Sequence, residues 1–373
     1  MVLLIALVAG CATTMVRDDV LSGGTVETRL AALGLTTADL AEPAAASAEM
    51  VDWIRQRVPD KGSQSERVNA LLTAVVEKRG LDLQYDAVYT GTAQEVFASR
   101  EANCLAFTHL VVGLGRELGL PVYYLGFRQR PRYEREGTLV VVWEHVTAGF
   151  GGPGERMILQ LAVGPRFDYE DARPISDQMA LAMHYSNRGA ELLRLEEPER
   201  AREMLKIATA VDPTWSHAWV NLGVAFRRSG ELEAAEAAYR RALIVAPDHV
   251  QAYHNLAMLL WLRDRRDAAS EILRLLDRRD NRDPFVYLSL GDMSRREQRP
   301  DEARRFYRRA ARLAPKSAEP LAALGLLAVL DEKRPRAERL LRRAEKRAPD
   351  EERVIRLRKA LELSSGVESS VSG

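Results

Sequence analysis

Residues 216–247 read SHAWVNLGVAFRRSGELEAAEAAYRRALIVAP, and this stretch decides the fold of the second half of the chain. Apolar and small residues recur in it at the spacing of a helix face, at Trp219, Leu222, Gly223 and Phe226 and again at Ala235, Tyr239 and Ala242. This spacing predicts two helices. Pro247 ends the second helix, because a proline inside a helix removes a backbone hydrogen bond. We therefore expect a pair of helices here.

The pattern of this stretch repeats along the chain with a period of about 34 residues. A small residue recurs on the first helix of each pair, at Gly189, Gly223, Ala257, Gly291 and Gly325. An alanine recurs on the second helix, at Ala201, Ala235, Ala269, Ala303 and Ala337. Small side chains let the two helices approach each other closely. The period resembles that of tetratricopeptide repeats, so we expect an all-α solenoid of five repeats over residues 181–350.

The end of such an array needs a cap, because each helix pair exposes apolar surface that only the next pair covers. Residues 351–364 carry apolar side chains at helical spacing and are expected to form a capping helix. The tail 365–373 lacks apolar side chains of any bulk, so we expect it to be disordered.

Two sets of polar residues recur in the repeats, the amides Asn187, Asn221 and Asn255 and the guanidinium groups Arg194 and Arg228. The resemblance implies a concave face, lined by the first helix of each pair, that holds an extended peptide. Amides suit a peptide backbone, and arginine suits a carboxylate. We therefore expect these five residues to bind a protein or peptide partner. The alternative is that they are solvated helix residues.

Charge is distributed unevenly between the two halves. Residues 1–181 contain 17 basic and 23 acidic side chains, whereas residues 182–373 contain 37 and 30. The basic excess of the repeats agrees with an acidic partner. It is too small and too mixed in sign to indicate nucleic acid, and we expect no nucleic-acid partner.

The region before the repeats mixes helix and strand signals. Helices are predicted at 50–58, 65–80 and 93–99 and from Cys104 to about Gly119. Strands are predicted at 121–127, 138–150, 157–163 and 166–170. We therefore expect an α+β domain over residues 45–180.

Cys104 lies in the stretch REANCLAFTHL, residues 100–110, where the fourth helix begins after the predicted N-cap Asn103. Backbone N–H groups at a helix start favour an anion and lower the pKa of a thiol. His145 alternates in phase with Trp143 on the predicted strand 138–150, so it is expected to face this helix. A thiol and a histidine so arranged are typical of a Cys–His nucleophile. The alternatives are that Cys104 is a small buried hydrophobic residue and that His109 is a polar surface residue.

Three segments of the first half, ANCLAFTHLVVGLGRELGLPVYY, WEHVTAGF and RFDYE, resemble the transglutaminase-like superfamily of papain-fold thiol enzymes. The resemblance covers about residues 65–180. It implies a papain-like α+β fold and a catalytic triad in which Cys104 is the nucleophile, His145 the general base and Asp168 the acid that orients His145. The sequence departs from the family pattern at Ala102, where a glycine is expected. Asp168 also follows a Gly-Pro break, with Glu170 and Asp171 close by.

The first residues, MVLLIALVAGCATT, resemble a bacterial lipoprotein signal. The apolar run is too short to span a bilayer and ends at Cys11, the residue that the resemblance assigns to lipidation. No basic residue precedes the run, which departs from the usual signal. We expect residues 1–11 to be signal and lipidated Cys11, followed by a linker over 12–44. The resemblance implies a chain anchored in the bacterial cell envelope, in the outer membrane and facing the periplasm.

Taken together, these patterns favour a lipid-anchored thiol enzyme, a peptidase or acyltransferase acting on peptide or glutamine amides, whose repeats recruit a protein partner. The alternative is a non-catalytic repeat scaffold with an inactive transglutaminase-like domain. We expect no cofactor. We also expect no metal, because the six histidines show no ligand spacing with the cysteines.

Overall fold

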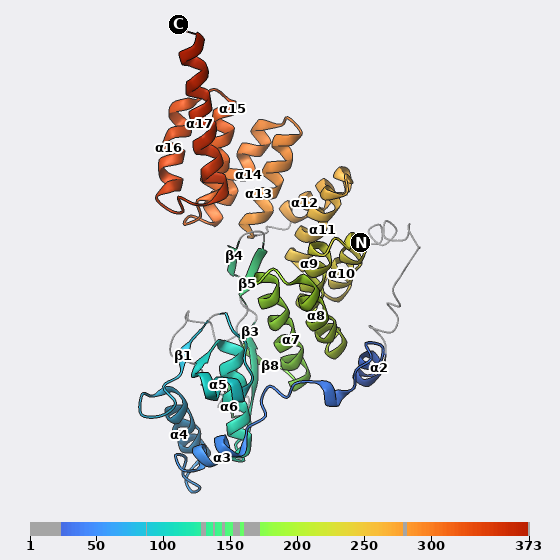
Figure 1. The fold of residues 1–373 in the computed structure, drawn as a ribbon, viewed down its shortest axis with the longest axis vertical. Coiled ribbons are helices and arrows are strands. Elements are labelled where there is room, and N and C mark those ends of the chain that lie inside the picture. Colours follow the sequence, from blue (N-terminus) through green and yellow to red (C-terminus); the bar gives the residue numbers. More distant parts are fainter. Residues whose placement is uncertain are drawn as a thin grey trace. The chain divides into compact units, whose positions relative to one another are not determined.

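The computed structural model describes residues 24–86, 88–127, 132–136, 139–143, 146–151, 157–159, 172–278 and 282–371. Residues 132–136, 139–143, Met157 and 364–371 are described by their backbone alone. The chain forms two compact units, one of residues 1–132 with 143–247 and the other of residues 133–142 with 248–373. Figure 1 shows the elements of both units along the chain.

The first described helix, α2 (Val26–Ala31), lies within the expected linker and is followed by a short 3-10 helix, η2 (Thr37–Asp39). Arg29 on α2 donates to the carbonyl oxygens of Ala210, at 2.6 Å, and Val211, at 3.3 Å, at the end of α8 (Pro198–Val211). Leu30 is fully buried. The described part of the expected linker, residues 24–44, is therefore structured and packs on the repeats.

Three short helices follow, α3 (Ala48–Arg55), α4 (Gln64–Val76) and α5 (Ala93–Ser99). All three were predicted. Ser63 caps α4, because its hydroxyl accepts from the Glu66 N–H while the Glu66 carboxylate accepts from the Ser63 N–H. The helix ends before Gly80, since the chain turns back there and the Leu81 N–H donates to the Ala74 carbonyl oxygen.

The long helix α6 (Cys104–Glu117) packs against a four-stranded antiparallel sheet. The strand order is β7 (Met157–Leu159), β6 (Val146–Phe150), β3 (Val122–Phe127) and β8 (Ala172–Pro174). A Cβ at Gly115 would lie 2.5 Å from a Val122 side-chain carbon, so this glycine lets α6 approach β3. The predicted mixture of a helix and strands is present, and Figure 1 shows α6 beside β3.

Two described strands, β5 (Leu139–Trp143) and β6, fall within the predicted strand 138–150. Strand β5 pairs with β4 (Arg132–Glu136) in a separate two-stranded sheet, whereas β6 pairs with β3 and β7. His145, which was expected to face α6, lies outside the described residues.

The helix pairs predicted from the repeats are confirmed. In the first unit they are α7 (Asp177–Arg194) with α8, and α9 (Ser216–Arg228) with α10 (Leu232–Val245). In the second unit they are α11 (Val250–Leu262) with α12 (Arg266–Arg278), α13 (Pro284–Arg296) with α14 (Pro300–Leu313), and α15 (Glu319–Leu330) with α16 (Arg334–Glu345). The repeated alanines of the second helices are fully buried.

The small residues of the first helices mark close approaches. A Cβ at Gly223 would lie 2.4 Å from Tyr239, and one at Gly291 would lie 2.3 Å from Tyr307, in each case on the partner helix of the same pair. Gly325 differs, because its Cβ would lie 2.3 Å from Leu357 on α17 (Glu352–Val371). The final helix therefore packs directly against the fifth pair.

Helix α17 covers the last pair with Val354, Leu357 and Leu361, all buried. Its backbone remains helical to Val371, so residues 365–371 differ from the disordered tail that their composition predicted. A helix that is already anchored can continue through polar residues, which composition alone does not reveal.

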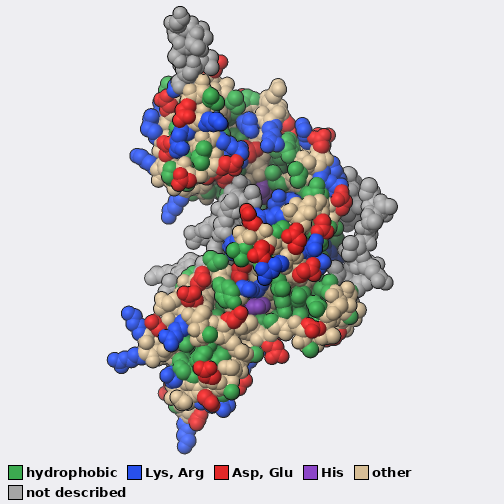
Figure 2. Space-filling view, viewed as in Figure 1, with side chains coloured by type: hydrophobic (Ala, Val, Ile, Leu, Met, Phe, Trp, Pro, Cys, Tyr) green, Lys and Arg blue, Asp and Glu red, His purple; other side chains and the backbone are tan. Residues whose placement is uncertain are grey.

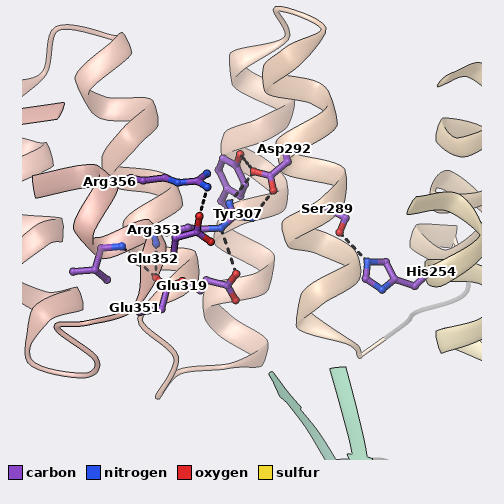
Figure 3. A network of polar contacts seen from close by, with 10 residues as sticks. His254, Ser289, Asp292, Tyr307, Glu319, Glu351, Glu352, Arg353 and Arg356 are labelled. Atoms are coloured by element: carbon purple, nitrogen blue, oxygen red, sulfur yellow. Dashed lines mark hydrogen bonds and ion pairs between the residues drawn. The ribbon is translucent and has the colours of Figure 1, made fainter. Parts of the chain in front are cut away.

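A polar network joins α17 to the preceding helices (Figure 3). Arg353 Nη1 donates to Asp292 Oδ1 on α13 at 2.8 Å, and the same guanidinium lies 3.3 Å from Glu319 on α15. Tyr307 on α14 also donates to Asp292, at 2.7 Å. Burial alone raises the pKa of Asp292, but Arg353, the Tyr307 hydroxyl and Arg295 together outweigh it and hold that pKa below its usual value. The network therefore ties three helices to α17.

Candidate functional site

Cys104 is the first residue of α6, as the sequence predicted. Asn103 is the N-cap, and its side-chain oxygen accepts from the Ala106 N–H at 2.9 Å. The chain enters the helix from β2 (Glu101–Ala102), which pairs in parallel with β1 (Gln84–Tyr85). The residue is half-buried. This arrangement fixes the thiol at a helix N-terminus.

The direction of the thiol's pKa differs from the sequence prediction. Burial raises the pKa of the Cys104 thiol, although the backbone N–H groups of Val146, Leu105 and Cys104 itself act in the opposite direction. The helix start does favour the thiolate, but the loss of hydration outweighs this effect. The expected lowering of the pKa by helix position alone is therefore wrong.

Strand β6 lies beside the first turn of α6. The Thr108 hydroxyl lies 2.6 Å from the Cys104 carbonyl oxygen and 3.4 Å from that of Val146. Val146 follows His145 directly in the sequence. His145 and Asp168, the other two members of the predicted triad, lie outside the described residues, as does the predicted lipidation residue Cys11.

A buried set of hydrogen bonds adjoins Asn103, and the sequence analysis did not find it. The Asn103 amide donates to the Thr90 hydroxyl at 2.6 Å, and the Thr90 N–H donates to Glu191 on α7 at 2.7 Å. Arg188 pairs with the second Glu191 oxygen at 2.6 Å. Thr90 and Glu191 are far apart in the sequence, so no local motif could have revealed their contact.

The alternative that His109 is a polar surface residue is wrong. His109 is 1% exposed and His184 is 5% exposed, with their ring centroids 5.4 Å apart. His109 Nδ1 lies 2.8 Å from the Tyr124 hydroxyl. Burial lowers the pKa of His184 to about 4 and also lowers that of His109. Two neutral imidazoles thus lie in the core between α6, β3 and α7.

Asn221, one of the predicted peptide-binding amides, contacts the neighbouring repeat. Its side chain donates to the Ser186 hydroxyl at 3.1 Å, from α9 to α7. In the second unit, His254 and Ser289 make a contact of 2.8 Å at the same sequence separation, from α11 to α13 (Figure 3). This repeat position therefore joins successive first helices. Asn187 and Asn255 are partly exposed, and neither side chain hydrogen-bonds another residue of the described ranges.

The two predicted arginines of the groove, Arg194 and Arg228, are both partly buried. Arg228 donates to the Leu193 carbonyl oxygen near the C-terminus of α7. Burial lowers the pKa of Arg228, with Arg227 acting in the same direction. A cation that satisfies a helix C-terminus stabilises the repeats by itself, so Arg228 has a structural role.

The visible surface of the helices from α15 to α17 carries Lys and Arg side chains interspersed with Asp and Glu (Figure 2). This visible face carries no extended patch of a single charge. Among the described helices, none is long and apolar enough to cross a membrane. Within the described ranges, no group of three or more His, Cys, Asp or Glu residues is arranged to hold a metal ion.

The family model for the tetratricopeptide repeat matches residues 187–250, 220–284 and 256–318. Residues 187–318 therefore carry tetratricopeptide repeats, as their period predicted. No curated protein resembles the chain closely enough to match it.

Several solved structures resemble the repeats. YrrB, described as a tetratricopeptide protein with an unusual peptide-binding site, is 20% identical over 48% of this chain and 92% of its own, with a TM-score of 0.36. PilF of Pseudomonas aeruginosa is 20% identical over 53% and 90%, with a TM-score of 0.45. A thermophilic tetratricopeptide protein of Thermus thermophilus is 19% identical over 48% and 98%, with a TM-score of 0.42. These likenesses concern the fold alone.

Proposed function

We propose that the chain recruits a protein partner with its repeats and that Cys104 is a catalytic thiol. The observation that carries the first half is the run of helix pairs whose residues 187–318 match the tetratricopeptide family. Repeats of this kind bind proteins and peptides. Asn187 and Asn255 are the amides that we assign to this role, because Asn221 is already bonded to Ser186.

The second half of the proposal is acyl transfer by a transglutaminase-like domain. Its support is the position of Cys104 at the start of α6, beside Val146, whose predecessor in the sequence is His145. We assign Cys104 as the nucleophile, His145 as the general base and Asp168 as the residue that orients His145. The substrate class is a peptide or glutamine amide, and no cofactor takes part.

In this mechanism His145 takes the thiol proton, and the Cys104 sulfur attacks the amide carbonyl carbon. The carbon–nitrogen bond breaks, the amine leaves with the proton from His145, and a thioester remains. Water or a second amine then attacks the thioester and restores the thiol. The backbone N–H groups at the helix start stabilise the thiolate before attack. A positively charged His145 would stabilise the thiolate and so offset the loss of hydration on burial.

The test is alkylation of Cys104 by iodoacetamide across pH, in full-length protein that carries Cys11→Ser so that one thiol remains. We expect labelling at pH 6 to be faster than that of an ordinary thiol of pKa about 8.5, and His145→Ala to slow it. His184→Ala is the control for loss of a histidine elsewhere. Ordinary labelling that His145→Ala leaves unchanged would refute the enzymatic half.

The second candidate is a repeat scaffold with an inactive thiol domain. The observation that favours it is the pKa of Cys104, which burial raises. An inert, protonated thiol is typical of a cysteine that packs as a small hydrophobic residue. The same alkylation experiment decides between the two, since a scaffold predicts no effect of His145 on the thiol.

For location, we propose a lipid anchor at Cys11 in the bacterial cell envelope, in the outer membrane and facing the periplasm. The support is the sequence VAGC that ends the apolar run at residues 8–11. We expect the wild-type chain to fractionate with membranes and Cys11→Ser to abolish this. A wild-type protein found in the soluble fraction with Met1 intact would refute the anchor.

A further inference from the structure

We propose that Glu191, on the first helix of the repeats, is a positioning residue for the Cys104 thiol and acts through Thr90 and Asn103. The inference rests on the thiol role of Cys104 proposed above. It assigns to the repeats a direct mechanical part in the thiol site, in addition to partner binding.

The connection runs through three hydrogen bonds in series. Glu191 Oε1 accepts from the Thr90 N–H at 2.7 Å, and the Thr90 hydroxyl accepts from the Asn103 amide at 2.6 Å. Asn103 Oδ1 in turn accepts from the Ala106 N–H at 2.9 Å and caps α6. Both polar atoms of the Asn103 side chain are thus bonded, the oxygen to the Ala106 N–H in the cap and the nitrogen to the Thr90 hydroxyl.

The connection is buried along its length. Glu191 is 8% exposed, Thr90 1% and Asn103 6%. Polar groups removed from water cannot exchange their partners with solvent, so these bonds hold their geometry more strictly than exposed ones. The second oxygen of Glu191 is held by Arg188, whose guanidinium lies 4.7 Å from the centre of the Tyr89 ring. The carboxylate is therefore oriented from both sides.

The first turn of α6 is where this geometry acts on the thiol. The N–H groups of Cys104 and Leu105 favour the thiolate, and they point at it only while the first turn is intact. The N-cap bond of Asn103 keeps that turn closed. If Asn103 loses its anchor on Thr90, its side chain gains rotational freedom, the cap weakens and the thiolate loses support. Glu191 therefore acts on the thiol without touching it.

Four variants test the inference by the pH midpoint of iodoacetamide labelling, again in full-length protein with Cys11→Ser. Thr90→Val removes the hydroxyl but keeps the backbone N–H that donates to Glu191. Glu191→Ala removes the acceptor, whereas Glu191→Gln retains an oxygen that can accept from Thr90. The fourth variant combines Thr90→Val with Glu191→Ala. Glu199→Ala, an exposed glutamate on α8, is the matched control.

We expect Thr90→Val and Glu191→Ala each to raise the midpoint by about half a pH unit. The double variant should raise it no further than Thr90→Val, because the bonds lie in series. Glu191→Gln should restore most of the wild-type value, and Glu199→Ala should leave it unchanged. The melting temperature of each variant is measured alongside, since a merely structural role lowers it without moving the midpoint.

Unchanged midpoints in both single variants, or shifts that add in the double variant, would overturn the inference. Either result can be measured whether or not His145 activates the thiol, because the labelling of any thiol has a pH midpoint. Failure of the enzymatic proposal appears separately, as labelling that does not respond to His145→Ala.

Discussion

At the scale of single residues, Cys104 combines two opposed effects on one thiol. The helix N-terminus and the N–H groups of Val146, Leu105 and Cys104 favour the thiolate, whereas burial disfavours it more strongly and raises the pKa. A sequence reveals the first effect, because the N-cap and the helix pattern are local. The second depends on β6, which packs on the first turn of α6 from a distant part of the chain. Reactivity of this thiol therefore depends on its tertiary neighbours.

His184 supplies a prediction for pH-dependent stability. Burial lowers its pKa in the folded protein to about 4, below the value of about 6.5 for an unfolded chain. Arg188 lowers it further, Glu95 opposes this, and the His109 and Tyr124 rings adjoin the site. The unfolded state thus binds more protons, so stability is lost as pH falls below about 6.5. From pH 7.5 to 5 the share of His184 is about 2 kcal/mol.

The variant His184→Gln should lose that share of the pH dependence. We expect the fall in unfolding free energy between pH 7.5 and 5, measured by urea titration, to be about 2 kcal/mol smaller than in the wild type. Each protein is compared with itself at the two pH values, so any pH-independent loss of stability caused by the substitution cancels. An equal fall in both proteins would show that His184 does not titrate below its usual range.

At the scale of elements, the repeat position of Asn221 makes a contact between the first helices of neighbouring repeats. The sequence analysis had assigned this position to peptide binding. Asn221 and Ser186 join α9 to α7, and Ser289 and His254 join α13 to α11. The recurring polar residue therefore stabilises the stacking of repeats at these two steps. Recurrence in a repeat protein can reflect a repeated internal contact as readily as a repeated ligand contact.

Helix α17 gives a prediction on stability. Arg353 contacts Asp292 and Glu319, and both acids would be left without their cation in Arg353→Ala. Because this network is partly buried, removing Arg353 should cost up to about 3 kcal/mol. Arg356→Ala is the matched control, because Arg356 lies on the same helix and pairs with Glu352 on the exposed surface. It should cost less than about 1 kcal/mol. Equal losses in urea unfolding of the two variants would contradict the assignment.

At the scale of the whole molecule, partner binding by the repeats is tested by a pull-down. Wild-type protein is compared with the double variant Asn187→Ala and Asn255→Ala, whose side chains make no hydrogen bond within the described residues. Each lost amide contact should weaken binding by about 1 kcal/mol, with no change in melting temperature. Asn221→Ala is the contrasting variant, because it should lower stability instead. Equal recovery of every partner by the wild type and the double variant would show that these amides do not bind it.

The sequence by itself determined the elements that depend on local patterns. The helix pairs followed from a period of about 34 residues, and α5, the N-cap Asn103 and the start of α6 followed from capping residues and apolar spacing. These signals are readable because helix formation, capping and the burial of one face depend on residues a few positions apart. The resemblance to transglutaminase-like enzymes also selected Cys104 from local residues, and the triad remains a prediction.

Only the tertiary structure decided which of these elements meet. It placed β5 and β6 in different sheets, buried His109 against His184, and joined Thr90 to Glu191 across the first unit. It also packed the segment around Arg29, expected as a linker, against the end of α8. Such contacts join residues far apart in the chain, and their energy comes from burial and from hydrogen bonds closed away from water. Neither quantity is a property of a short stretch of sequence, so no local pattern records it.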